Sequence, residues 1–204
     1  MNEKFYTLPE EKQRRIINAG FHVFSQNSYR KSPMSEIADA AGISKSLLFH
    51  YFLNKKELYL FLWEEGAKVT IQYLEKYGCY EKCGFFEQME RGMKAKLHIM
   101  NRYPDMGLFM LKAYYEKDSE VSGEIQECYQ RYKNGEASRT FEELKQEDFV
   151  PGIDLEMMHR DMHMASTGYL WEIMHQQKPI QLEKLQQDFS KMIQFWKKIY
   201  TGKE

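Results

Sequence analysis

Apolar residues recur along this chain with the 3.6-residue period of amphipathic helices, and no segment shows the strict alternation of a half-buried strand. All five prolines stand where a helix is expected to begin. The pattern therefore predicts an all-α protein of about nine helices. We expect them over residues 9–26, 34–41, 45–51, 55–77, 84–102, 105–117, 119–147, 154–176 and 181–200, with a bend or break near Asn134 and Gly135.

The stretch Met34–Phe52, MSEIADAAGISKSLLFHYF, predicts two short helices joined by a tight turn. Ser32 is a candidate cap for the first helix, and Ser44 is a candidate cap for the second. Gly42 stands between them, where the backbone has to turn sharply and a positive φ is expected. This arrangement is typical of a helix-turn-helix.

The second helix has an unusual outward face. Leu48 and Phe52 are expected to point inward, and the remaining positions carry one fixed positive charge with hydroxyl, imidazole and aromatic groups. Such a set suits a DNA major groove, because lysine can meet phosphates and ring edges can touch thymine methyls. The alternative is an ordinary helical hairpin with exposed aromatics. The outward residues are Lys45, Ser46, Leu47, Phe49, His50 and Tyr51.

Residues Ile16–Tyr59 resemble the DNA-binding head of TetR-family transcriptional regulators over three helices and the start of a fourth. In that family a lysine at the position of Lys55 binds a phosphate, so the resemblance implies this role for Lys55. The chain departs from the family where Phe49 replaces a frequent tyrosine and where Ser46 replaces a small residue. The candidate DNA-binding residues are therefore Ser32, Ser44, Lys45, Ser46, Leu47, Phe49, His50, Tyr51 and Lys55.

The charge distribution agrees with a division into a DNA-binding head, residues 1–54, and a helical ligand-binding and dimerisation body, residues 55–204. Residues 1–56 hold nine basic and five acidic side chains, whereas the remainder holds twenty basic and twenty-five acidic ones. The formal net charge of −1 hides this asymmetry. A positive head on a negative body is what a DNA-binding protein with a separate second domain would show.

The last two predicted helices carry apolar stripes whose spacing alternates between three and four residues. Two such helices at the end of the chain predict a four-helix interface between two copies, although the stripes could instead be consumed by the chain's own core. The resemblance implies dimerisation of this kind. The candidate interface residues are Met158, Met162, Ala165, Tyr169, Leu182, Leu185, Phe189, Met192 and Trp196.

The resemblance also implies a small-molecule pocket in the body, whose occupation moves the fourth helix and releases DNA. Methionine and aromatic side chains line adaptable apolar pockets, and they also fill ordinary cores. We expect an apolar or aromatic ligand. The candidate pocket residues are His98, Met100, Phe109, Met110, Tyr114, Tyr129, Met158, Met162, His163 and Tyr169.

Other chemistry has weaker support. His159 and His163 are four residues apart, with Glu156 as a third metal ligand by spacing, but partly buried or surface histidines explain the pattern equally simply. Cys79 and Cys83 could form a zinc or redox pair. No phosphate-binding loop, dinucleotide turn or nucleophile elbow is present in the sequence, so we expect no enzyme activity, no metal and no cofactor.

The first residues show no signal-peptide pattern, no apolar run is long enough to span a bilayer, and three cysteines give no disulfide framework, so we expect a cytoplasmic protein. The sequence as a whole predicts a repressor that leaves a palindromic DNA operator when an apolar ligand binds. The alternative is a helical dimeric interaction protein with a vestigial DNA-binding head.

Overall fold

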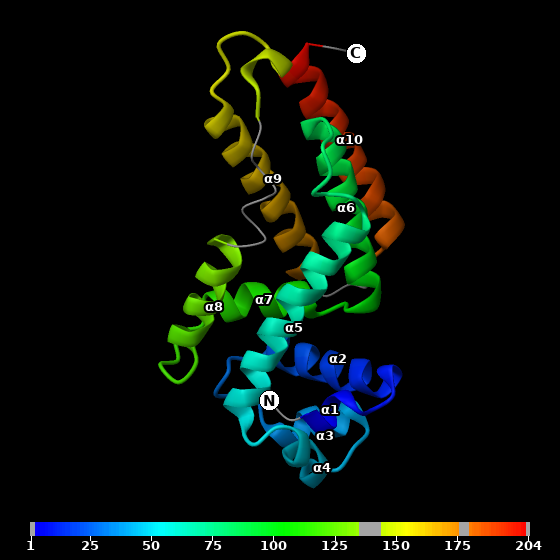
Figure 1. The fold of residues 1–204 in the computed structure, drawn as a ribbon, viewed down its shortest axis with the longest axis vertical. Coiled ribbons are helices and arrows are strands. Elements are labelled where there is room, and N and C mark those ends of the chain that lie inside the picture. The colour runs from blue at the N-terminus through cyan, green and yellow to red at the C-terminus, as the bar shows by residue number, and fades with distance from the viewer. Residues whose placement is uncertain (1–2, 135–143, 176–179, 203–204) are drawn as a thin grey trace. The chain divides into compact units, whose positions relative to one another are not determined.

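The computed structural model describes residues 3–134, 144–175 and 180–202. Within these ranges the chain forms ten α-helices, one short 3-10 helix and no strand, which confirms the all-α prediction (Figure 1). The predicted break at Gly135 and the predicted loop at 177–179 lie outside the described residues. The helices are α1 (Glu3–Tyr6), α2 (Glu10–Gln26), α3 (Met34–Ala41), α4 (Lys45–Tyr51), α5 (Lys55–Lys76), α6 (Phe85–Arg102), α7 (Met106–Tyr114), α8 (Ser122–Asn134), the 3-10 helix η2 (Gln146–Asp148), α9 (Leu155–His175) and α10 (Leu182–Thr201).

The helices gather into two compact units, which do not follow the predicted boundary after residue 54. The first unit holds Met1–Gln72 and Ile99–Ala137, and the second holds Tyr73–His98 and Ser138–Glu204. Helices α1–α4, most of α5, α7 and α8 therefore belong to the first unit. The two-domain division at residue 54 remains a prediction.

An aromatic cluster forms the centre of the first unit. The rings of Phe21 and Phe24 on α2 lie 5.3 and 6.1 Å from the ring of Phe109 on α7. Tyr59 on α5 closes the cluster, because its ring lies 4.8 Å from Phe24 and 5.2 Å from Phe109. Edge-to-face contacts of this kind add to the stabilisation from burial. The helix-turn-helix is thus held on a core to which α5 and α7 both contribute.

Gly20 lets α2 approach α5 closely. A Cβ atom at this position would lie 2.5 Å from Cδ1 of Leu62, so only glycine fits without a shift of that side chain. The close approach at Gly20 is therefore between α2 and α5.

In the second unit, α6, α9 and α10 run alongside one another (Figure 1). Their buried side chains form one apolar core, which includes residues that the sequence assigned to an interface between two copies. Met158, Met162 and Trp196 are core residues, and Leu185 is buried as well. These four interface predictions are wrong, because a side chain that its own chain already covers has no surface left for a partner. Among the described residues, no helix is long and apolar enough to cross a membrane.

Candidate DNA-binding site

The helix-turn-helix is built from α3 and α4 as the sequence predicted. Gly42 has a φ of 63°, and its N–H group reaches the carbonyl oxygens of Ala38 and Asp39 at the end of α3. The Oγ of Ser44 then accepts a hydrogen bond of 3.1 Å from the N–H group of Leu47 and caps α4. The left-handed turn and the second cap are therefore confirmed.

Helix α4 presents a mixed polar and aromatic face to solvent. Lys45, Ser46 and His50 are exposed, and Phe49 is 40% exposed. The Nζ of Lys45 lies 5.9 Å from the centre of the Phe49 ring, so charge and ring share one patch. Leu48 and Phe52 are buried on the opposite side, which confirms the predicted inward pair. Leu47 is half-buried.

Two predicted DNA-binding residues face the interior. Ser32 is fully buried and its hydroxyl donates a 3.0 Å hydrogen bond to the carbonyl of Ser28, so it neither caps α3 nor reaches DNA. The residue before α3 is Pro33, and it makes no side-chain cap. Tyr51 is also buried, because the ring of Phe5 covers it. We withdraw Ser32 and Tyr51 from the DNA-binding set.

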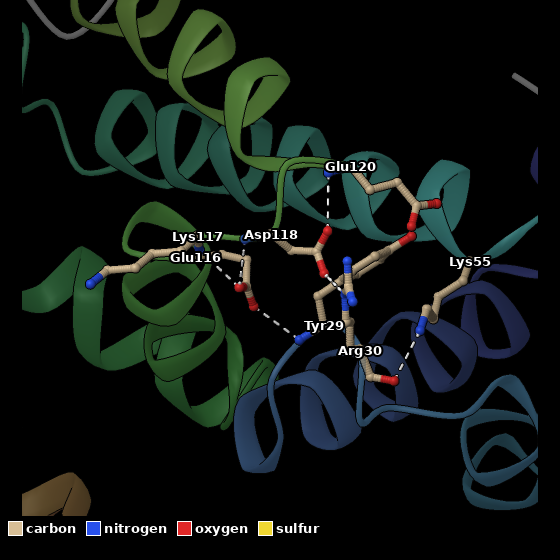
Figure 2. Close-up of polar contacts among 7 residues, drawn as sticks. All are labelled: Tyr29, Arg30, Lys55, Glu116, Lys117, Asp118 and Glu120. Carbon is tan, nitrogen blue, oxygen red and sulfur yellow. Dashed lines mark hydrogen bonds and ion pairs between the residues drawn. The ribbon is translucent and has the colours of Figure 1, made fainter.

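The start of α5 holds Lys55 in a defined place. The side-chain oxygen of Asn54 accepts a 2.8 Å hydrogen bond from the N–H group of Glu57 and caps the helix. The Nζ of Lys55 donates a 3.3 Å hydrogen bond to the carbonyl of Arg30 and lies 4.5 Å from the centre of the Tyr29 ring. Figure 2 shows Lys55 beside the loop that carries these residues.

The ring that covers Tyr51 belongs to α1, a helix that the sequence reasoning missed. Phe5 is 1% exposed and contacts Tyr51, Phe52 and Phe61 with ring centres 6.0, 5.2 and 5.1 Å apart. A single aromatic residue in a short polar stretch gives no helical period to detect. Its only sequence signal is an aromatic pair, Phe5 and Tyr6, among charged residues.

Comparison with known proteins places this site in a family. The sequence profile described as "Bacterial regulatory proteins, tetR family" matches residues 16–61, which cover α3, α4 and the start of α5. The transcriptional activator FasR of Mycolicibacterium smegmatis is 40% identical over 60 residues, which are 29% of this chain and 27% of that protein. The fatty acid metabolism regulator protein of Bacillus subtilis is 32% identical over 65 residues, which are 32% of this chain and 34% of that protein.

Solved structures extend the likeness to the whole fold. The ketosteroid regulator KstR2 of Mycobacterium tuberculosis has a TM-score of 0.68 at 14% identity, with 97% of both chains covered. Residues 16–61 therefore carry the DNA-binding domain of the TetR family, and the fold of the chain is that of solved TetR regulators. This family consists of transcriptional regulators with an N-terminal DNA-binding domain and not of enzymes. The sequence matches to FasR and to the Bacillus regulator span about a third or less of those relatives, so only the DNA-binding domain is matched in sequence.

The predicted ligand residues of this TetR-family chain do not converge. Phe109 lies in the aromatic core of the first unit, whereas Met158 and Met162 lie in the core of the second. These three side chains pack in cores in this structure. All ten pocket assignments stay predictions, and the other seven residues are His98, Met100, Met110, Tyr114, Tyr129, His163 and Tyr169.

Two of those polar candidates already have partners within their own unit. The Nδ1 of His98 lies 3.0 Å from the hydroxyl of Tyr77, and the Tyr169 hydroxyl donates a 2.6 Å hydrogen bond to Asp188. Burial, with the carboxylate of Asp188, raises the pKa of Tyr169 to about 12. Among the described residues, no group of three histidine, cysteine or acidic side chains could hold a metal ion.

Proposed function

We propose that this TetR-family protein is a homodimeric, sequence-specific DNA-binding repressor that acts in the cytoplasm and leaves a palindromic operator when a small apolar ligand binds. The exposed face of α4 beside Lys55 is the observation that carries the proposal. Lys45 and Lys55 supply charge for phosphates, while Ser46, Phe49 and His50 offer groups that suit base edges. Phosphate contacts fix the register of the protein, and base contacts select the sequence.

A second copy of the chain is the partner that fits the exposed face of α9 and α10. Met157, Met164 and Trp171 follow one another at intervals of seven residues on α9 and are 50%, 66% and 46% exposed. Phe195 and Ile199 stand one turn apart on α10 and are exposed as well. Apolar stripes at this spacing suit a helical interface between identical chains.

Small residues on the same stretch of α9 support close contact with that partner. Ala165 and Gly168 are exposed, and a Cβ atom at Gly168 would meet no atom of its own chain within 4 Å. The dimer also has a functional reason, since one short recognition helix gives little specificity. Two copies reading half-sites one helical turn apart select a palindrome.

An open groove in the first unit is the place where we propose that the ligand binds. It has a volume of about 330 Å³. Its lining consists of Trp63, Glu64, Ala67, Lys68, Ile71 and Gln72 of α5 with Cys128 and Arg131 of α8. An apolar wall with a guanidinium at its edge suits an apolar molecule with an acidic group. The names of two relatives, a fatty acid metabolism regulator and a ketosteroid regulator, agree with ligands of this kind.

The groove lies against α5, the helix whose first residue is Lys55. A ligand that prefers the conformation unable to bind DNA changes DNA affinity only by that preference. A hundredfold release needs about 2.7 kcal/mol of coupling free energy. Burial of an apolar molecule in a groove of this size can supply such a preference.

The experiment that tests DNA reading is selection of bound sites from random duplex DNA by the purified protein. Enrichment of a palindrome supports a dimeric repressor of defined sequence preference. Enrichment of a single half-site would contradict the dimeric mode. A folded dimer that enriches nothing at low salt would instead favour the alternative, a helical interaction protein with a vestigial head.

The ligand is tested separately with saturated fatty acids and steroid acids added to the protein–operator complex. We expect release by at least one of these compounds, and we expect Ala67→Trp to abolish it by filling the groove. Gly107→Ala is a suitable control, because it changes an exposed position of α7 that does not line the groove. Release that survives Ala67→Trp unchanged would place the ligand elsewhere.

A further inference from the structure

We propose that Arg30 binds a DNA phosphate beside Lys55, and that Asp118, on the loop between α7 and α8, is the positioning residue that aims its guanidinium. This inference rests on the DNA-binding function of the head. It adds a phosphate contact that the helix-turn-helix pattern does not reveal, since Arg30 stands in the loop before α3. It also gives the loop after α7 an indirect part in DNA binding, through Arg30.

The guanidinium of Arg30 is held at one end and exposed at the other. Its Nε lies 2.5 Å from Oδ2 of Asp118, while the side chain as a whole is 80% exposed. Arginine carries five N–H donors in a planar fork, and this contact uses only the inner one. The two outer nitrogens keep four donors that match the geometry of a phosphate.

Asp118 is itself a fixed anchor. Its side chain is only 5% exposed, and Oδ1 accepts a 3.0 Å hydrogen bond from the N–H group of Glu120. That hydrogen bond and the guanidinium of Arg30 lower the pKa of Asp118 below its ordinary value. The carboxylate is therefore charged at neutral pH and lies in one orientation.

The same loop also fixes the backbone next to Arg30. One carboxylate oxygen of Glu116 accepts a 2.9 Å hydrogen bond from the N–H group of Tyr29, and the other accepts hydrogen bonds from the N–H groups of Lys117 and Asp118. Figure 2 shows the two acidic side chains reaching from this loop to Tyr29 and Arg30. The loop between α7 and α8 thus holds both the main chain at Tyr29 and the side chain of Arg30.

Lys55 lies next to Arg30, and it is the residue that we expect to bind a DNA phosphate. Its Nζ donates to the carbonyl oxygen of Arg30, so the two cationic residues are direct neighbours. Lys31, which follows Arg30, is exposed. A phosphate bound by Lys55 would therefore lie within a short distance of the outer nitrogens of Arg30.

The opposite outcome is physically possible, because Asp118 could withhold Arg30 from DNA instead of aiming it. Three acidic side chains, Glu116, Asp118 and Glu120, stand on the loop. The direction of the effect of Asp118→Asn separates the two. A positioning residue lowers DNA affinity when it is removed, whereas a competing anion raises DNA affinity when it is removed.

The test measures the dissociation constant of the full-length protein for a selected duplex as a function of salt. The variants are Arg30→Ala, Arg30→Lys, Asp118→Asn and the double variant, with Lys117→Ala as a control that removes one charge from the same loop. Loss of one phosphate contact in each protomer of the proposed dimer should reduce the salt slope by about 1.8 and weaken binding about sixtyfold at 0.1 M salt. We expect this for Arg30→Ala, and only a partial recovery for Arg30→Lys, which keeps the charge but lacks the fork.

Asp118→Asn should weaken binding in the wild-type background and have no further effect once Arg30 is alanine. If Asp118 had only a structural role, Asp118→Asn would lower the unfolding midpoint equally in both backgrounds. The effects of the two substitutions on DNA affinity would then be additive. The inference is overturned if Arg30→Ala leaves the salt slope unchanged, or if Asp118→Asn tightens binding. Failure of the wild type to bind any duplex would overturn the proposed function together with the inference.

Discussion

The ring of Phe5 lies 5.2 Å from the ring of Phe52, directly after the last residue of α4. A residue from the first helix of the chain therefore holds the end of the recognition helix in place. Because Phe5 is 1% exposed and also touches Phe61, it links α4 to α5.

Phe5→Ala should lower the free energy of unfolding by about 3 to 5 kcal/mol, as for other buried phenylalanines, and Phe5→Leu should cost about 1 kcal/mol. Chemical denaturation followed by circular dichroism measures both. The neighbouring Tyr6→Phe is the control, since Tyr6 is 41% exposed and the change keeps the ring and removes only the hydrogen bond to Glu65. Equal effects from the alanine and leucine variants would argue against tight packing of this ring.

Lys55→Ala should weaken binding to all duplexes alike, because a phosphate contact carries no sequence information, and it should reduce the salt slope by about one for each protomer of the proposed dimer. Lys56→Ala is the matched control, since its ammonium forms an ion pair with Glu124. Ser46→Ala and His50→Ala should instead change the preferred sequence. The measurement is site selection followed by salt titration. A sequence preference altered by Lys55→Ala would contradict this division of roles.

Phe195→Glu should give monomers that keep their fold, because Phe195 is 62% exposed on α10. Its neighbour Trp196 is buried in the chain's own core, so Trp196→Glu should unfold the second unit. Sedimentation velocity with thermal denaturation separates the two outcomes. A folded dimer of Phe195→Glu would move the interface to another surface.

The carboxylate of Asp118 predicts a specific pH dependence. Its pKa is lowered in the folded protein by the N–H group of Glu120 and by Arg30, so its contribution to stability is fully present above about pH 4, the ordinary value for an unfolded aspartate. This contribution is lost as the pH falls through the lower folded pKa. The stability difference between the wild type and Asp118→Asn should therefore be constant near neutrality and shrink in acid. A constant difference down to about pH 2 would exclude the ion pair as its source.

The helix-turn-helix could be predicted from the sequence because its signals are local. Gly42 and Ser44 fix the turn and the cap within a few residues, and the observed bounds of α3 and α4 are those expected. The prediction of a cap at Ser32 was wrong because it also relied on a local signal. A serine before a proline looks like a cap, and only the fold shows that its hydroxyl turns inward to Ser28.

The proposed dimer face could not be predicted in the same way. The heptad spacing assigns the apolar stripe of α10 to a partner, yet Leu185 and Trp196 of that stripe are buried by the chain itself. Ile199, at the end of the stripe, and its neighbour Phe195 remain exposed. Periodicity identifies apolar faces, but it does not say which face meets its own chain and which is left for another.

The ion pair between Arg30 and Asp118 could not be predicted from the sequence either, because the two residues stand far apart in the chain. Nothing local marks Asp118 as the partner of Arg30, and a charged pair in two loops has no period. The pair emerges only when α7 is packed against α2. Contacts of this kind depend on tertiary structure alone.

The place of Phe109 in the aromatic cluster has a consequence for biosynthesis. Phe21, Phe24 and Tyr59 leave the ribosome well before the ring that completes their packing. A nascent chain that ends after α5 therefore exposes apolar surface and is a client for chaperones, because domains settle only when their last core element has been made. The helices of the DNA-binding domain are therefore translated before the α7 ring that completes their packing.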